Sequence, residues 1–368
     1  MKAKGSKGLK ILIAPLNWGL GHATRCIPII KILLSQGVEV IIACGSPQKS
    51  LLQSEFPSLR FEYLPGYDLK YGKNGVLTVL KIIFQIPKIL IQIKREKRWL
   101  ANFYDSEGLD AVISDNRYGL FSSKIPCFFM THQLRISTPF GKMADDYIQR
   151  INYRYINLFR ECWIPDFDHE QNLAGELSHP RIPPAIPRQY LGCLSRFNRK
   201  DLPVVSGAVV IILSGPEPQR TILEKIILRQ LPNRGCEATL IRGLPDAGEP
   251  VPEVTNYRVY NHLPASALNK IICESEFVIC RSGYSSIMDI VKLDKKSIVI
   301  PTPGQREQEY LAGYLLRKKV VFAKDQAHFD LKAAIGEAKH FPYVHYNEIT
   351  DFGLEQTVSA MIAEIKKN

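Results

Sequence analysis

FVICRSGYSSIMDIV (residues 277–291) joins an apolar run to a short polar turn and then to a second apolar run. The first run is typical of a buried parallel strand and the second of the beginning of a helix, so the stretch predicts one strand–turn–helix unit of an α/β fold. Its small turn residues leave backbone N–H groups available at the positive end of the helix, where a diphosphate would bind. Asp289 falls where a carboxylate would accept ribose hydroxyls. The alternative for the turn alone is an ordinary helix start capped by serine.

A second strand and loop follow directly and favour the interpretation as a ligand site. The apolar run 297–300 ends at Pro301, and the polar segment 302–310 contains Gln308 and Glu309. Open α/β sheets bind ligands outside the carboxyl ends of their strands, and both polar loops hold that position. The two loops together therefore predict one binding site.

Arg281-Ser282-Gly283 with Asp289, then Pro301 and Gln308-Glu309, resembles the donor-nucleotide signature of MurG-type glycosyltransferases. These enzymes form the family-28-like branch of the GT-B fold. The resemblance implies two Rossmann-like doubly wound domains that face a cleft, with a nucleotide sugar held by the second domain. Two positions depart from the family pattern, because Asp289 stands where Glu is usual and Glu309 where Gln is usual. The second departure bears on which sugar is accepted.

The beginning of the chain predicts a strand–helix–strand unit with a glycine turn. Residues 10–15 and 38–44 are the apolar runs, and Gly19, Gly21 and His22 lie in the turn between them. A dinucleotide fingerprint is excluded here because the third glycine and the downstream acidic residue are missing. By the resemblance, Gly21 lies near the donor and His22 faces the cleft as a candidate general base. The alternative is that His22 only stabilises the turn.

Polar residues end two further predicted strands of the first half. Asp115 ends the run that begins at Ala111, and His132 follows the run 127–131. We expect both to reach the cleft, with Asp115 as a second candidate base and with Asn17, Arg117 and His132 on the acceptor side. The alternative for Asp115 is a cap on the following helix. Residues 162–168 predict the last strand of this half, and we interpret Asp166-x-Asp168 there as structural and predict no metal.

A segment rich in proline and arginine, residues 175–199, is the predicted linker. We therefore expect an acceptor-side domain over 1–195, a donor domain over 196–350 and a C-terminal helix over 351–368 that crosses back. In the donor domain the resemblance implies nucleotide-sugar contacts beyond the signature, and Arg220 is expected to neutralise the diphosphate. The complete expected donor set is Gly21, Ser214, Gly215, Arg220, His262, Leu263, Arg281, Ser282, Gly283, Ser286, Asp289, Gln308 and Glu309.

Net charge and composition restrict the partners. The chain carries a formal charge of +12, and residues 1–195 hold 25 Lys and Arg against 16 Asp and Glu. This excess in the first half favours an anionic partner, such as a membrane surface or a lipid acceptor, and we expect no nucleic acid. Residues 77–99 predict either a membrane-surface helix with a basic end or a core helix, and residues 66–75 an acceptor-side loop. The cysteines show no metal or disulfide spacing, and neither a signal peptide nor a membrane span is expected. We predict a cytoplasmic protein, with peripheral attachment to the inner face of the membrane as the variant.

The function that the resemblance implies is glycosyl transfer. We expect an inverting, metal-independent hexosyltransferase that uses a UDP-linked sugar and an acceptor hydroxyl and needs no cofactor. Two alternatives share the fold: a nucleotide-sugar 2-epimerase or hydrolase, and a non-catalytic protein that binds nucleotide sugars.

Overall fold

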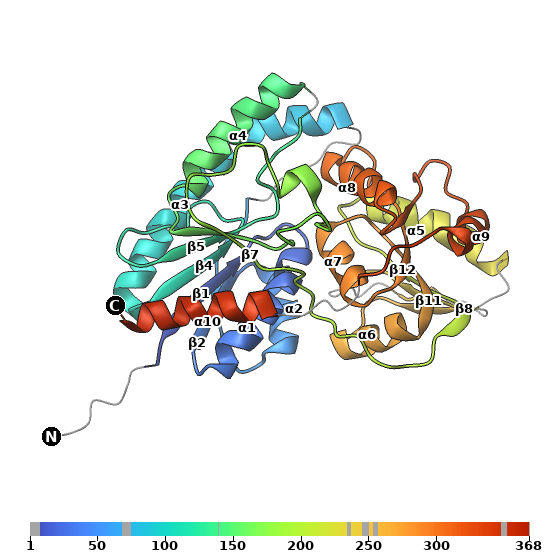
Figure 1. Cartoon of the computed structure of the whole chain (residues 1–368), viewed down its shortest axis with the longest axis horizontal. Helices are drawn as coiled ribbons and strands as arrows, with labels where there is room; N and C mark the ends of the chain where they lie inside the picture. The colour runs from blue at the N-terminus through green and yellow to red at the C-terminus, as the bar shows by residue number, and fades with distance from the viewer. Residues whose placement is uncertain are drawn as a thin grey trace.

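The computed structural model describes residues 8–67, 75–138, 140–233, 237–244, 250–252, 257–346 and 352–367. Most of the predicted loop 66–75 lies outside the described residues, as do the side chains of residues 75–84. The described chain forms two separate parallel sheets with helices packed on them, one sheet in each half of the molecule (Figure 1). The predicted pair of doubly wound α/β sheets is therefore confirmed.

The first sheet has seven parallel strands in the order β3-β2-β1-β4-β5-β6-β7. Its strands are β1 Lys10–Pro15, β2 Glu39–Cys44, β3 Arg60–Tyr63, β4 Ala111–Asp115, β5 Cys127–Met130, β6 Glu161–Ile164 and β7 Arg188–Tyr190. Its helices are α1 Gly21–Ser35, α2 Ser46–Glu55, α3 Gly75–Glu107 and α4 Lys142–Ile156, with a 3₁₀ turn η1 at Gly175–Leu177. The prediction that β6 is the last strand was wrong, because β7 pairs beside it through Cys162–Arg188 and Ile164–Tyr190.

The second sheet repeats the same winding with six parallel strands in the order β10-β9-β8-β11-β12-β13. Its strands are β8 Val205–Ile212, β9 Ala238–Ile241, β10 Arg258–Tyr260, β11 Ser275–Cys280, β12 Lys296–Val299 and β13 Phe322–Ala323. Its helices are α5 Gln219–Gln230, α6 Ala265–Glu274, α7 Tyr284–Lys292, α8 Arg306–Arg317 and α9 Leu331–His340, with a 3₁₀ turn η2 at Leu231–Asn233.

Both sheets are apolar on both faces, as parallel sheets covered by helices must be. In β1, Ile11, Leu12 and Ile13 are fully buried, and Ile11 and Leu12 belong to different core clusters on opposite sides of the sheet. The final helix α10, Phe352–Lys367, packs against α1 and β7 of the first sheet (Figure 1). Gln36 Nε2 donates to Ser359 Oγ at 2.7 Å across that contact.

The strand order places a topological switch point in each sheet. The connection changes direction between β1 and β4 in the first sheet and between β8 and β11 in the second. Ligands of open α/β sheets bind in the crevice at such a point, beyond the carboxyl ends of the strands. The residues after these four strands are therefore the first place to look for a functional site.

A buried ion pair holds the loops at the carboxyl end of the first sheet. Arg117 and Glu96 are both fully buried, and Arg117 NH1 donates to Glu96 Oε1 at 2.8 Å. The guanidinium also donates to the carbonyls of Pro15 at 2.9 Å and of Pro65 at 3.0 Å. It therefore ties the end of β1 and the segment after β3 to α3.

Replacing Arg117 by alanine should reduce the free energy of unfolding by about 3–5 kcal/mol, because it leaves the Glu96 carboxylate buried and unpaired. Chemical denaturation measures the loss. The control is Arg60→Ala, which removes a half-exposed partner of Glu107 and should cost much less. Equal losses in the two variants would contradict this role of the buried pair.

Candidate active site

His22 and Asp115 meet at the switch point of the first sheet. His22 is the second residue of α1 and Asp115 the last residue of β4, and His22 Nδ1 lies 3.0 Å from Asp115 Oδ2. Asp115 is fully buried, whereas 14% of the His22 side chain is exposed. Arg25 NH2 also lies 2.9 Å from this Nδ1, but it donates to Asp115 Oδ1. We assign the proton to Nδ1 because a carboxylate faces it, which leaves the lone pair of Nε2 available to accept a proton.

Arg25 fixes the Asp115 carboxylate from one turn further along α1. Its Nε donates to Asp115 Oδ2 at 2.9 Å, and its NH2 donates to Asp115 Oδ1. Burial raises the pKa of Asp115, but the charges of Arg25 and His22 and their hydrogen bonds outweigh it and lower the pKa to about 2. Asp115 is therefore a carboxylate at any working pH. Sequence reasoning missed Arg25, although its spacing of three residues from His22 places both on one face of the helix.

The imidazole of His22 is neutral near pH 7. Burial lowers its pKa from the usual 6.5, and Arg25 and His132 add to that effect, while Asp115 opposes it. A neutral imidazole held by a buried carboxylate can take a proton and is then stabilised as the imidazolium by that carboxylate. The pair therefore has the composition and the geometry of a general base.

The two switch points lie close to each other, and residues of the two halves are in contact there. A Cβ on Gly21 at the beginning of α1 would lie 2.1 Å from Ser285 Oγ at the beginning of α7, so only glycine fits there. The rings of His132 and Tyr284 stack with centroids 4.1 Å apart, and Tyr284 Oη donates to the carbonyl of Pro165 at 2.7 Å. His132 Nε2 lies 2.8 Å from Glu307 Oε1 of α8. The predicted site residues Gly21 and His132 are thus in contact with the second half of the chain.

Beyond the second sheet, two buried polar atoms point to one side of Gly215. Gly215 has a φ of +103°, and a Cβ built on it would lie 3.5 Å from Thr302 Oγ1 and 4.0 Å from Arg281 Nε. Both atoms are buried without a hydrogen-bond partner among the described residues. They follow β12 and β11, while Gly215 follows β8. Two hydrogen-bond donors therefore converge at the switch point of the second sheet.

The rest of the predicted signature holds the loops of this site in place. Arg281 is fully buried and donates to the carbonyls of Ile300, Pro301 and Gln219 and to Gln326 Oε1. Ser282 Oγ donates to the carbonyl of Gln308 at 2.9 Å, and Gln308 Oε1 accepts from Thr302 N at 2.8 Å. Glu309 Oε1 accepts from Gly304 N at 2.8 Å. These contacts are internal, and the predicted contacts of these side chains with a donor stay predictions.

Asp289 lies on α7 beside the linker. Its Oδ1 accepts a hydrogen bond from Ser195 Oγ at 2.5 Å. Burial raises the pKa of Asp289 to about 6, although the charge of Arg196 and the bond from Ser195 lower it. Asp289 is half-buried, and with this pKa it is mainly a carboxylate at pH 7 and can accept hydrogen bonds.

Arg220 takes part in a buried ion cluster rather than facing open space. Its NH1 donates to Glu224 Oε2 at 3.0 Å and its Nε to Glu217 Oε1 at 2.5 Å, and Arg242 Nε donates to Glu224 Oε1. The remaining predicted donor residues lie at the ends of neighbouring elements: Ser214 after β8, His262 and Leu263 after β10, and Gly283 and Ser286 at the beginning of α7.

The predicted acceptor-side residues divide into two groups. His132 lies in the cleft beside Tyr284, as described above. Asn17 and Arg117 bond to each other, with Asn17 Oδ1 also accepting from Gly45 N at 3.2 Å, so they brace the ends of β1 and β2. Contact of Asn17 or Arg117 with an acceptor stays a prediction.

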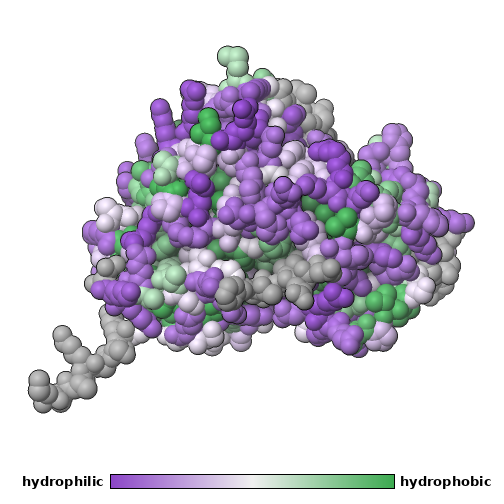
Figure 2. All heavy atoms as spheres, viewed as in Figure 1, coloured by the Kyte–Doolittle hydropathy of each residue, from purple (hydrophilic) through white to green (hydrophobic). Residues whose placement is uncertain are grey.

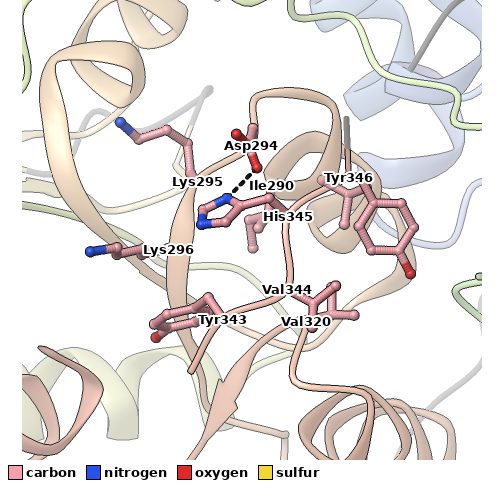
Figure 3. Close-up of a pocket in the computed structure, with 10 residues that line it drawn as sticks. Ile290, Asp294, Lys295, Lys296, Val320, Tyr343, Val344, His345 and Tyr346 are labelled. Carbon is pink, nitrogen blue, oxygen red and sulfur yellow. Dashed lines mark hydrogen bonds and ion pairs between the residues drawn. The ribbon is translucent and has the colours of Figure 1, made fainter. Parts of the chain in front are cut away.

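A small pocket on the second half of the chain, drawn in Figure 3, contains none of the predicted site residues in its lining. It is lined by residues of α7, the following turn and the segment 343–346, and His345 Nδ1 lies 2.7 Å from Asp294 Oδ1 there. Among the described residues, no group of three or more His, Cys, Asp or Glu side chains is arranged to hold a metal. Asp166, of the Asp166-x-Asp168 pair, instead accepts from the backbone of Phe167, Leu173 and Ala174 and from Ser178 Oγ.

Comparison with known proteins bears directly on this arrangement. Residues 245–361 match the glycosyltransferase family 28 C-terminal domain. The chain is a glycosyltransferase of the GT-B fold, and its C-terminal region is similar to that family 28 domain. The glycosyltransferase is 23% identical to an uncharacterized glycosyltransferase of Methanosarcina acetivorans over 332 residues, which cover 82% of each chain.

Solved structures agree with the fold. MurG of Acinetobacter baumannii superimposes with a TM-score of 0.52 at 12% identity, covering 98% of this glycosyltransferase and 95% of MurG. UGT2 of Phytolacca americana, in complex with UDP-2-fluoro-glucose and pterostilbene, gives a TM-score of 0.56 at 14% identity, covering 98% and 94%. The MurG-like resemblance and the GT-B fold predicted from the sequence are both confirmed.

Proposed function

We propose that this glycosyltransferase moves a hexose from a UDP-linked donor to an acceptor hydroxyl with inversion at the anomeric carbon. The observation that carries the proposal is the convergence of Arg281 Nε and Thr302 Oγ1 beside Gly215. Buried donors without partners are costly unless a ligand satisfies them, and a phosphate oxygen is an acceptor of the required charge. The beginning of α7 lies at the same switch point and adds the positive end of a helix.

In this proposal the donor half stabilises the leaving group. Arg281 and the N–H groups of α7 hold the diphosphate as negative charge develops on it, which is the electrostatic role that metal ions have in other transferases. Asp289 accepts the ribose hydroxyls, and Gln308 and Glu309 are the predicted sugar contacts. The choice of UDP is supported by the UDP-sugar bound to the plant relative of the same fold.

The acceptor half supplies the base. The acceptor oxygen attacks the anomeric carbon while its proton moves to Nε2 of His22, and the bond from that carbon to the diphosphate oxygen breaks. Asp115 stabilises the imidazolium that forms, as its 3.0 Å contact with Nδ1 allows. A single displacement of this kind inverts the anomeric configuration, so an α-linked donor should give a β-glycoside.

Replacing His22 by alanine should lower turnover of UDP-glucose with an accepted hydroxyl compound by about 10²-fold or more, while affinity for UDP stays nearly unchanged. NMR of the reaction mixture measures turnover and the configuration of the product. In the wild type, turnover should be lost on the acid side as the pH falls through the pKa of His22, because a protonated imidazole cannot accept a proton. Burial lowers that pKa, so the loss should occur below pH 6.5.

The control is His328→Ala, which changes an exposed histidine outside the cleft and should keep full turnover. Retained turnover in His22→Ala would contradict the assignment of the base. NMR with UDP-glucose and no acceptor separates the alternatives, because an epimerase or hydrolase would release an epimer or free sugar, and a binding protein would leave the donor intact.

We further propose that the acceptor half attaches to an anionic membrane surface through α3 and α4. On α4, Met143, Tyr147 and Ile151 are exposed and spaced by four residues, which places them on one face of the helix. On α3, Ile86 and Leu90 are exposed in the same way, and Ile89, Ile93 and Tyr155 of the two helices belong to one apolar cluster. The exposed apolar side chains of these two helices are named here the α3/α4 surface.

The helices of the α3/α4 surface also carry basic side chains. The exposed ones are Lys88, Lys94, Arg95, Lys97, Arg98, Lys142, Arg150 and Arg154. Figure 2 shows hydrophilic side chains gathered over α3 and α4 with hydrophobic ones between them. Exposed apolar side chains together with basic ones suit insertion among anionic headgroups. No helix of the described residues has the length and apolar character that crossing a bilayer requires.

The double variant Met143→Ser with Tyr147→Ser should bind phosphatidylglycerol vesicles several-fold more weakly than the wild type in a sedimentation assay at low salt. Raising the salt concentration should also weaken vesicle binding by the wild type, because salt screens the charges of the exposed Lys and Arg side chains of α3 and α4. The control is Ile182→Ser, which removes an equally exposed apolar side chain of the linker. Equal binding by all three proteins, or none by the wild type, would contradict the membrane proposal.

A further inference from the structure

A chain of contacts connects the base to the donor half of the molecule. Arg25, which holds Asp115, has its NH1 3.1 Å from His132 Nδ1, and His132 Nε2 lies 2.8 Å from Glu307 Oε1. His132 is 5% exposed and is pressed against Tyr284. The chain thus runs from β4 and α1 through the segment after β5 to α8 in the donor half.

The hydrogen positions in this chain follow from chemistry. Arg25 only donates, and its NH1 group faces His132 Nδ1 rather than Asp115, so this nitrogen of His132 accepts and carries no proton. Burial raises the pKa of Glu307, but the hydrogen bond from His132 and the charge of Arg25 lower it below the usual value, so Glu307 is a carboxylate. Nε2 of His132 therefore carries the proton and donates to Glu307. Both requirements are met by one neutral tautomer of His132.

Glu307 also changes the charge that surrounds His22. The titratable and charged groups around His22 are Asp115 from β4, Arg25 from α1, His132 after β5 and Glu307 from α8. With both histidines neutral, these groups sum to one negative charge, and a proton on His22 brings the sum to zero. Without Glu307 the same proton would bring the sum to a positive charge, which is less favourable in a buried site.

We propose that Glu307 is a positioning residue of the donor half that completes the catalytic base when the two halves of the molecule are in contact. This inference rests on the proposed function, because it gives His22 the role of base. Glu307 directly precedes Gln308 and Glu309, the predicted sugar contacts, so the loop that reads the donor also carries the charge that supports the base. The base is then fully supported only when the donor loop lies against His132.

The test is the pKa of His22 in the free protein, followed by NMR of histidine labelled with ¹³C at Cε1. His22→Gln identifies the His22 signal and His132→Gln that of His132. Glu307→Gln should lower the pKa of His22 by about half a unit or more, because it removes a negative charge from a buried site. The control is Glu337→Gln, the same change at an exposed residue of α9, which should leave that pKa unchanged.

An unchanged or raised pKa of His22 in Glu307→Gln would overturn the proposal. A second measurement stands even where that variant folds poorly: long-range ¹H–¹⁵N spectra of the wild type should show His132 as the neutral tautomer with its proton on Nε2. A proton on Nδ1 at pH 7 would also overturn the proposal. Neither measurement uses a substrate, so a failure here is distinguishable from an absence of glycosyl transfer.

Discussion

The buried carboxylate of Asp115 is the group on which the rest of the candidate active site depends. A buried carboxylate is costly unless it is paired, and here Arg25 binds both of its oxygens while His22 contacts one of them. Strand β4 carries it to the switch point of the first sheet, and α1 begins just where His22 and Arg25 can reach it. Glycine at position 21 then allows α1 to meet α7 of the other sheet directly.

The second sheet uses the same winding for a different purpose. At its switch point the side chains mostly bond to loop backbone, as Arg281, Ser282 and Gln308 do. That bracing leaves Arg281 Nε and Thr302 Oγ1 beside Gly215 without a hydrogen-bond partner among the described residues. One sheet therefore offers a proton acceptor and the other offers hydrogen-bond donors. A transfer between an acceptor hydroxyl and a leaving diphosphate needs this division of charge.

Much of the fold could be predicted from the sequence because parallel strands buried on both faces appear as continuous apolar runs. The segment of β7 was expected in the linker rather than in the first sheet, because the strand has only three residues and is mostly exposed at the edge. Asp115 and His22 could be expected in one cleft since both follow strands at a switch point. Arg25, Tyr284 and Glu307 could not, because their roles depend on contacts between segments about 90 to 175 residues apart. The fully buried position of Arg281 likewise depends on four carbonyl and amide partners in separate loops.

Calorimetric titration with UDP, GDP, dTDP and NAD most directly tests the claim that the donor half binds a uridine nucleotide at this switch point. The titration compares the wild type, Asp289→Ala and the control Asp325→Ala, which changes an exposed carboxylate after β13. The predicted result is selective binding of UDP that Asp325→Ala keeps and Asp289→Ala loses. Binding of UDP that is unchanged in Asp289→Ala, or no binding of any nucleotide, would contradict it.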